Sequence, residues 1–326
     1  MVRLHTKGVL MIDCNMKNLK KGFIPVMLTP FKENGEIDFD TLTQLTKFYA
    51  ASGSSGLFAN CLSSEMYELT PEEMLNATRH IVEVVNGTIP VVASGNFGEN
   101  TKIQAEFIKR VHDTGVEAVI LITSLIAGEA ESDEVFNERV LNLIRMTNGI
   151  PLGFYECPVP YKRLITPEQL KLFIATGRII YHKDTCLDIT QVRQKIAAGK
   201  GHNFGLYDAY IGHAVESLQA GSAGLSCIQG NFFPELIVWL CENYNTSSSK
   251  KDVEKAQRFL RDNMDVMHRV YPQVAKYYLQ KRGLDISIFT RAQRGGVFNA
   301  SVKNQIDNLF KDYSRLTEEL NLEVLL

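Results

Sequence analysis

The sequence predicts an α/β fold: a (β/α)₈ (TIM) barrel followed by an appended C-terminal helical region. Eight short apolar runs recur, and their starts are separated by 21 to 34 residues. Most runs are continuously apolar rather than alternating, as expected for parallel strands covered on both faces. Helical patterns lie between them, and eight strand–helix repeats close into a barrel more readily than into an open sheet. The first run is followed by Thr29-Pro30-Phe31 and no G-x-G-x-x-G, which disfavours a dinucleotide-binding sheet.

The eight apolar runs are taken as the barrel strands. They are 23–28, 56–61, 90–94, 118–123, 151–155, 179–182, 203–207 and 224–228. Two of the intervening helices begin with the same signal, Thr70-Pro71-Glu72-Glu73 and Thr166-Pro167-Glu168-Gln169. Each has a capping threonine, a proline at the first helical position and an acid or amide at the third. Further helices are predicted over 101–114 and 133–146, which end near glycines.

The strand signal stops after about residue 232. Three helical stretches follow, at 234–244, 251–279 and 302–320. The expected organisation is therefore an irregular N-terminal extension (1–21), the barrel (22–232) and a C-terminal helical region (233–326). The helical region is expected to pack on the barrel rather than form an independent domain.

The charge and the cysteine spacing of the chain disfavour several classes of function. The chain has 326 residues, with 35 basic and 37 acidic side chains and a formal net charge of −2, so nucleic-acid binding has no electrostatic support. None of the six cysteines forms a C-x-x-C pair, which favours a reduced, cytoplasmic setting over a zinc or redox motif. The N-terminal apolar run 8–12 is too short for a signal peptide or a membrane span.

A lysine ends the sixth predicted strand, in the stretch Ile179-Ile180-Tyr181-His182-Lys183-Asp184. Either Lys183 points into water, or the strand presents it at the carboxyl end of the barrel, where active sites of such barrels lie. A lysine has an unperturbed pKa of about 10.4, so only about one in two thousand is neutral at pH 7. Burial in an apolar barrel mouth lowers that pKa and makes the amine a nucleophile toward carbonyl groups. His182 would then point away from the barrel interior.

Two other strand ends carry polar groups. Tyr155 ends the fifth strand beside the expected position of Lys183, and is either a core residue or a proton carrier. The second strand ends in Cys61-Leu62-Ser63-Ser64-Glu65. This segment is either an ordinary polar turn or a cradle of amides and hydroxyls for a carboxylate. Glu65 is expected to bond backbone amides around the turn.

As a set, these motifs resemble the dihydrodipicolinate synthase / N-acetylneuraminate lyase family. Besides the strand ends above, Thr29-Pro30-Phe31, the 28-residue interval from Tyr155 to Lys183, and Gly224, Asn231 and Pro234 fit its pattern. The resemblance covers about residues 22 to 310. It implies a class I aldolase-type mechanism without a cofactor or metal, and an assembly typical of the family, a homotetramer or homodimer.

The resemblance also implies roles for particular residues. Lys183 would form a Schiff base with pyruvate or another 2-oxo acid, and Tyr155 would carry protons. Ser63 and Ser64, with nearby amides, would hold the substrate carboxylate. Leu62 and Cys227 are placed with them as substrate-binding residues.

The sequence departs from the family pattern at the positions that choose the second substrate. Leu62 stands where the synthases have a threonine of their proton relay, and the loop 123–128 lacks the relay's second tyrosine. No arginine follows Tyr155 in register, although Lys162 and Arg163 are near. The segment 209–212 lacks the acids of the sialic acid lyases. Leu62, with Leu125 and Ile126, predicts an apolar mouth and a smaller or less hydroxylated second substrate.

Two other classes of protein are alternatives to a Schiff-base-forming enzyme. A metal-dependent aldolase would need histidine and carboxylate ligands at strand ends, and the sequence offers few; a cysteine metal site is less plausible than buried cysteines. A non-catalytic 2-oxo acid sensor or binding protein on the same barrel is the alternative, supported by the missing relay residues. Retention of Lys183 and Tyr155 favours an enzyme, a carbon–carbon or carbon–oxygen lyase.

Overall fold

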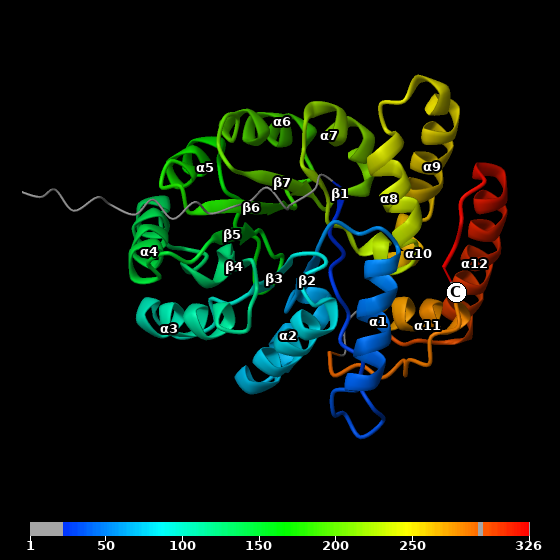
Figure 1. Cartoon of the computed structure of the whole chain (residues 1–326), viewed down its shortest axis with the longest axis horizontal. Coiled ribbons are helices and arrows are strands. Elements are labelled where there is room, and N and C mark those ends of the chain that lie inside the picture. Colours follow the sequence, from blue (N-terminus) through cyan, green and yellow to red (C-terminus); the bar gives the residue numbers. More distant parts are fainter. Residues whose placement is uncertain (1–21, 293–295, 326) are drawn as a thin grey trace, which may run out of the picture.

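Residues 22–292 and 296–325 are described by the computed structural model, which is a parallel barrel with helices packed at one side (Figure 1). The eight parallel strands follow the order β1-β8-β7-β6-β5-β4-β3-β2. The strands are β1 (Gly22–Phe23), β2 (Leu57–Ala59), β3 (Val91–Ser94), β4 (Ala118–Ile122), β5 (Leu152–Tyr155), β6 (Ile179–Asp184), β7 (Gly205–Asp208) and β8 (Gly224–Leu225). A parallel bridge from Val26 to Phe58 joins the two ends of this order. The predicted barrel is confirmed.

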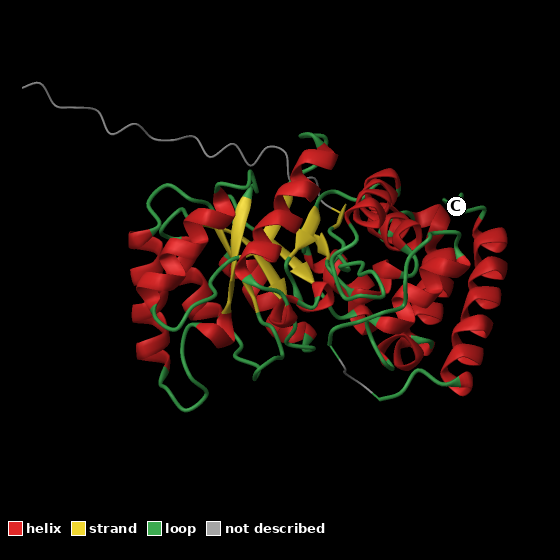
Figure 2. Ribbon diagram, turned by 90° about the horizontal axis from the view of Figure 1, so that it is seen from below, coloured by secondary structure: helices red, strands yellow, loops and turns green. Residues whose placement is uncertain are grey.

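Helices lie around the outside of the strands, as Figure 2 shows. In the barrel part they are α1 (Phe39–Ala51), α2 (Pro71–Val85), α3 (Thr101–His112), α4 (Asp133–Met146), α5 (Pro167–Ile174), α6 (Ile189–Ala198) and α7 (Ala214–Ala220). The two predicted capping boxes are present: Thr70 begins α2 and Thr166 begins α5, each with a reciprocal bond to the third helical residue. The described helices include none long and apolar enough to cross a membrane.

The C-terminal part is helical, as predicted, and gathers beside β1 and β8 (Figure 1). Its helices are α8 (Pro234–Asn243), α9 (Lys250–Asp262), α10 (Met264–His268), α11 (Gln273–Lys281) and α12 (Ala300–Leu320). The prediction of a single helix over 251–279 is wrong, because the helix is interrupted at Asn263 and again between α10 and α11. Proline at 272 disfavours helical geometry in the residue before it, and Val270 adopts a left-handed φ of 49°.

The extension 1–21 lies outside the described residues, and the division of the chain at residue 232 stays a prediction. One buried ion pair joins the C-terminal part to the barrel, and a second lies within the C-terminal part. Lys276 of α11 pairs with Glu65 at 2.9 Å. Arg282, just after α11, pairs with Glu235 of α8. Glu65 also accepts a hydrogen bond from the Ala292 amide, so the turn after β2 is anchored by this region.

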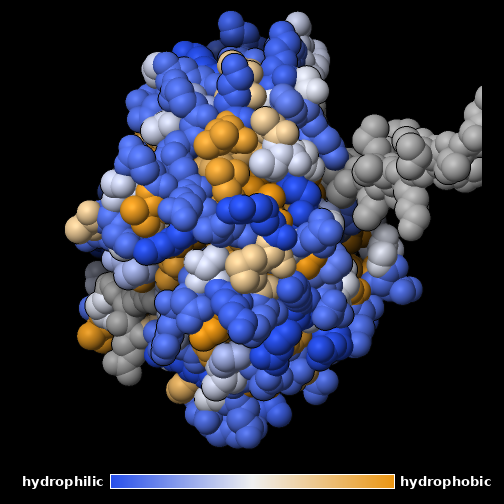
Figure 3. Space-filling view, turned by 90° about the vertical axis from the view of Figure 1, so that its left-hand side faces the viewer, coloured by the Kyte–Doolittle hydropathy of each residue, from blue (hydrophilic) through white to orange (hydrophobic). Residues whose placement is uncertain are grey.

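Seen from the side that carries α3, α4 and α5, the surface is largely hydrophilic, with separate apolar groups between the polar ones (Figure 3). The large apolar side chains exposed on these three helices are Ile103, Met146 and Leu172, one on each.

Candidate active site

Lys183 lies near the carboxyl end of β6 and points into the barrel. Its in-register neighbours are Tyr155 on β5 and Tyr207 on β7. Lys183 is only 4% exposed. Its Nζ lies 4.4 Å from the centre of the Tyr155 ring and 5.8 Å from that of Phe58. The amine is therefore held against aromatic faces rather than in solvent.

The surroundings of Lys183 favour a neutral amine. Burial lowers its pKa below the ordinary value of a lysine. The groups that act in the opposite direction and raise the pKa of Lys183 are the thiols of Cys61, Cys157 and Cys227. Burial raises the pKa of the Cys157 thiol, and raises that of Cys227 to about 12, so neither is an anion at pH 7. Among the described residues, no carboxylate forms an ion pair with Lys183.

Tyr155 ends β5 and is 3% exposed. Its ring packs edge-on against Phe58, with centroids 5.6 Å apart. Burial, with the nearby Cys157 and Cys61, raises the pKa of Tyr155 well above its ordinary value. The phenol therefore keeps its proton at neutral pH.

The turn after β2 separates the two predicted serines. Ser63 lines the same cavity as Lys183. Ser64 is not among the residues that line it: its hydroxyl donates to the Met27 carbonyl at 2.7 Å and accepts from the Cys61 amide. Ser64 thus holds the turn, and Ser63 presents a hydroxyl.

A cavity of about 240 Å³ opens above Lys183. Its walls are mostly apolar and come from the barrel loops and from the C-terminal part. The lining residues include Leu62, Pro158, Leu187, Ile211, Ile228 and Met264. Cys227 is buried close to Lys183 but is not one of the lining residues. The expectation that Leu125 and Ile126 line this mouth is wrong, because they border a separate depression with Glu99 and Arg139.

The polar cavity residues that sequence reasoning missed include three that lie beyond the last predicted strand. Tyr271 reaches it from the break between α10 and α11, and its hydroxyl donates to Ser63 Oγ at 2.7 Å. Gln229 is 1% exposed and its Oε1 has no hydrogen-bond partner among the described residues. His268 of α10 stands at the rim, with Nδ1 2.8 Å from the Met264 carbonyl. No local motif marks any of them, since all follow the barrel strands in sequence.

The basic residues after Tyr155 point elsewhere. Arg163 donates to Asp133 and to the carbonyls of Gly128 and Glu131, on the side of α4. Lys162 donates to the Thr185 carbonyl at 2.8 Å. Neither is among the residues that line the cavity.

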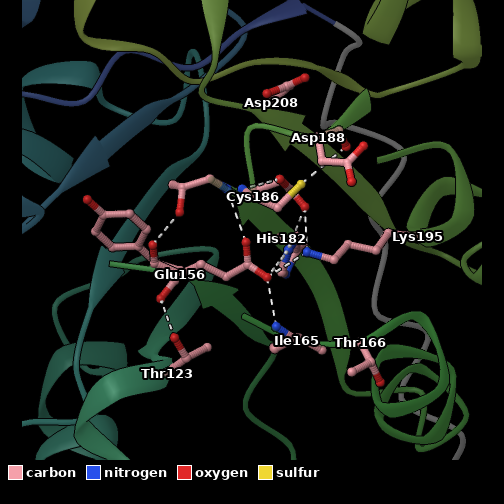
Figure 4. A network of polar contacts seen from close by, with 12 residues as sticks. Thr123, Glu156, Ile165, Thr166, His182, Cys186, Asp188, Lys195 and Asp208 are labelled. Atoms are coloured by element: carbon pink, nitrogen blue, oxygen red, sulfur yellow. Dashed lines mark hydrogen bonds and ion pairs between the residues drawn. The ribbon is translucent and has the colours of Figure 1, made fainter. Parts of the chain in front are cut away.

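A second buried cluster lies on the opposite face of β5 and β6 (Figure 4). Lys195 of α6 donates to Glu156 at 2.6 Å and to Asp184 at 2.7 Å. His182 Nε2 lies 3.5 Å from the same two carboxylates, which places it behind the strand as expected. Glu156, His182 and Asp184 have the composition of a metal site. The Lys195 ammonium, bonded to both carboxylates, supplies the positive charge instead, so the cluster fits an ion-pair network better than a metal.

Comparison with known proteins agrees with this architecture. The sequence profile of the dihydrodipicolinate synthetase family matches residues 19–304. The 4-hydroxy-tetrahydrodipicolinate synthase of Clostridium perfringens is 27% identical over 224 residues, which cover 69% of this chain and 75% of the relative. That of Bacillus subtilis is 24% identical over 261 residues, covering 80% and 88%.

Solved structures share the fold. YagE, a prophage protein of the dihydrodipicolinic acid synthase family from E. coli K12 in complex with pyruvate, superposes with a TM-score of 0.81 at 21% identity, covering 90% of this chain and 98% of that one. A monomeric dihydrodipicolinate synthase variant gives 0.81 at 20% identity, covering 91% and 98%. The chain is thus an enzyme of the lyase and aldolase class. It belongs to the dihydrodipicolinate synthetase family.

Proposed function

We propose that this enzyme forms a Schiff base between Lys183 and pyruvate or a related 2-oxo acid. The observation that carries the proposal is a buried lysine that forms no ion pair with a carboxylate of the described residues and faces a cavity at the carboxyl end of the barrel. The family relative YagE, solved with pyruvate, supports the substrate class.

The reaction begins with attack of the neutral Lys183 amine on the C2 carbonyl, which gives a carbinolamine. Loss of water forms the iminium, and loss of a C3 proton forms an enamine that attacks an electrophilic carbon; the reverse sequence cleaves a bond. Tyr155, a protonated phenol beside Nζ, is assigned to carry the protons of carbinolamine formation and dehydration. No cofactor is required for these steps.

The substrate carboxylate is assigned to the Ser63 end of the cavity. Ser63 is a cavity-lining hydroxyl, whereas Ser64 supports the same turn from behind. Leu62 contributes an apolar wall rather than hydrogen bonds, and Cys227, buried behind the lining residues, helps to keep the surroundings of Lys183 low in dielectric. In this arrangement the carboxylate is recognised mainly by neutral donors.

The second substrate is inferred to be an apolar or weakly hydroxylated carbonyl compound. The relay threonine of the synthases is replaced by Leu62, and Arg163 faces α4 rather than the cavity. The walls include Leu187, Ile211 and Met264, and Gln229 is the one buried side-chain amide among the described lining residues. An amide with an unpartnered atom in a cavity is a candidate for one specific hydrogen bond to the ligand.

The oligomer and the cellular setting are proposed from the family and from the sequence. We propose a homotetramer or homodimer in the cytoplasm, without a nucleic-acid or membrane partner. The alternative function is a sensor that binds 2-oxo acids without turnover, favoured by the absence of the synthase relay residue at Leu62.

The decisive experiment is reductive trapping. The protein is incubated with pyruvate, reduced with borohydride, and mapped by peptide mass spectrometry. An adduct on Lys183, absent in Lys183→Ala, is expected. An adduct with longer 2-oxo acids and not with pyruvate moves the substrate class, whereas tight 2-oxo acid binding without any adduct supports the sensor.

A further inference from the structure

The break between α10 and α11 brings a tyrosine into the barrel mouth. Val270, a β-branched residue, has a φ of 49°, which is a left-handed conformation that such residues rarely adopt. Strain of this kind persists where surrounding contacts hold it, and it clusters at functional sites. Here it precedes Tyr271, which is one of the residues lining the cavity with Lys183 and Ser63.

The Tyr271 hydroxyl makes two hydrogen bonds with buried partners. It receives one from Asn231 Nδ2 at 2.6 Å and donates one to Ser63 Oγ at 2.7 Å. Asn231 also donates from Nδ2 to the Val26 carbonyl at 3.0 Å and accepts from the Tyr49 hydroxyl. The four residues form a continuous chain from α1 to the cavity.

The direction of this chain is fixed by one group. A backbone carbonyl can only accept, so the Val26 carbonyl holds the Asn231 amide nitrogen on its own side. That nitrogen also faces Tyr271, and therefore the Tyr271 oxygen is an acceptor from Asn231. Its own proton is directed to Ser63, and the Ser63 proton is left to point elsewhere. Ser63 lines the cavity, so that proton is available to a ligand.

We propose that Tyr271 is a positioning residue that fixes Ser63 as a hydrogen-bond donor to the substrate carboxylate; this inference rests on the proposed function. A hydroxyl that rotates freely spends part of its time with a lone pair toward the anion, so binding must first restrict it to the donating orientation. A hydroxyl that is already held in that orientation avoids this loss of binding free energy. This matters because the only lysine or arginine among the described lining residues is Lys183, whose amine attacks C2. Burial also raises the pKa of Tyr271, so the phenol stays protonated at neutral pH.

The test compares Tyr271→Phe with the wild type, using pyruvate and acetaldehyde as the carbonyl compounds and borohydride trapping on Lys183 as the readout. We expect the half-saturating pyruvate concentration to rise about 10-fold. The trapping rate at saturation should change less than about threefold, and trapping of acetaldehyde, which has no carboxylate, should not change. The matched control is Tyr277→Phe, whose hydroxyl donates to Asp307 away from the cavity.

A second comparison separates positioning from general damage. In a Ser63→Ala background the Tyr271→Phe change should have no further effect on half-saturation. Independent, additive effects of the two substitutions, or an unchanged half-saturation in Tyr271→Phe, would overturn the proposal. If Tyr271→Phe does not fold, Asn231→Asp replaces the amide donor by an acceptor and should turn the Tyr271 proton away from Ser63. Half-saturation equal to the wild type at every pH would then count against the inference.

Failure of the proposed function gives a different result. The wild type itself would then form no adduct with either compound. In that case pyruvate binding to the same variants is measured by calorimetry, and a dissociation constant unchanged by Tyr271→Phe contradicts the role of Tyr271.

Discussion

Lys183 of β6 and Lys195 of α6 are both buried, and their amines lie on opposite sides of β6. Their pKa values are shifted in opposite directions. Lys183 faces aromatic rings and thiols inside the barrel, and burial lowers its pKa. Burial also disfavours the charge of Lys195, but the charges of Glu156 and Asp184 outweigh it and hold its pKa above the ordinary value. The strand alternates between a reactive face and a structural face, one residue apart.

Lys276 shows how many carboxylates are needed to keep the pKa of a buried lysine above its ordinary value. It is buried and donates to one carboxylate, Glu65, and to the Phe289 carbonyl. Burial still lowers its pKa, although Glu65 acts in the opposite direction. Of these three buried, described lysines, only Lys195, which has two carboxylate partners, has a pKa above the ordinary value. Burial alone therefore does not identify a nucleophile; access to a cavity does, and Lys183 is the one of the three that lines it.

The largest effect is expected from Lys183→Met. Removal of the proposed nucleophile should abolish trapping and lower turnover on the order of 10⁴–10⁶-fold. The free energy of unfolding should stay equal or rise, because Lys183, a buried polar group with no ion pair among the described residues, is replaced by an apolar side chain. Denaturant unfolding and borohydride trapping measure the two effects. Residual trapping at another lysine would contradict the assignment of Lys183 as the nucleophile.

Lys195→Met should have the reverse profile. It leaves Glu156 and Asp184 buried without the lysine ammonium that bonds both of them, which is expected to lower the free energy of unfolding by about 3–5 kcal/mol. Trapping at Lys183 should persist in the folded fraction. The surface variant Lys200→Met is the control, and adding Glu156→Gln and Asp184→Asn should recover most of the loss. Equal stability of Lys195→Met and Lys200→Met would contradict the network.

Leu62→Asp brings an anion to the reactive face. It should raise the pKa of Lys183 and move the pH midpoint of trapping upward by about 1–3 units. The direction follows because a nearby carboxylate stabilises the ammonium, so a higher pH is needed for the free amine. Leu62→Asn is the uncharged control. The wild-type midpoint should lie below about 10.4, the value of an unperturbed lysine.

The smallest effect concerns His182. Burial lowers its pKa, but Glu156 and Asp184 outweigh burial, so the pKa lies above the ordinary value. The stability it contributes is fully present below the unfolded pKa of about 6.5 and is lost as pH rises through the folded value. His182→Gln should therefore cost on the order of 1 kcal/mol more at pH 5.5 than at pH 9. The exposed His202→Gln should show no such difference in urea unfolding.

Local signals in the sequence were enough for much of the fold. The strands fall within or beside the predicted runs, and the capping signals place Thr70 and Thr166 at helix starts. Alternation along β6 placed His182 and Lys183 on opposite faces, because side-chain direction in a strand has a period of two. The prediction failed over 251–279, where the apolar periodicity favours one helix but the proline at 272 and the left-handed backbone of Val270 interrupt it.

The sequence by itself determined the barrel, the family, and the lysine and tyrosine at adjacent strand ends, since periodicity, caps and motif spacing are local. Tertiary structure alone decided the environment of each buried lysine. It also decided that Ser63 rather than Ser64 faces the cavity, and that Tyr271 bonds Ser63 across 208 positions of the chain. The physical reason is that a pKa or a hydrogen-bond direction depends on every group packed within a few ångströms. Folding brings those groups from distant segments, and no sequence period records their meeting.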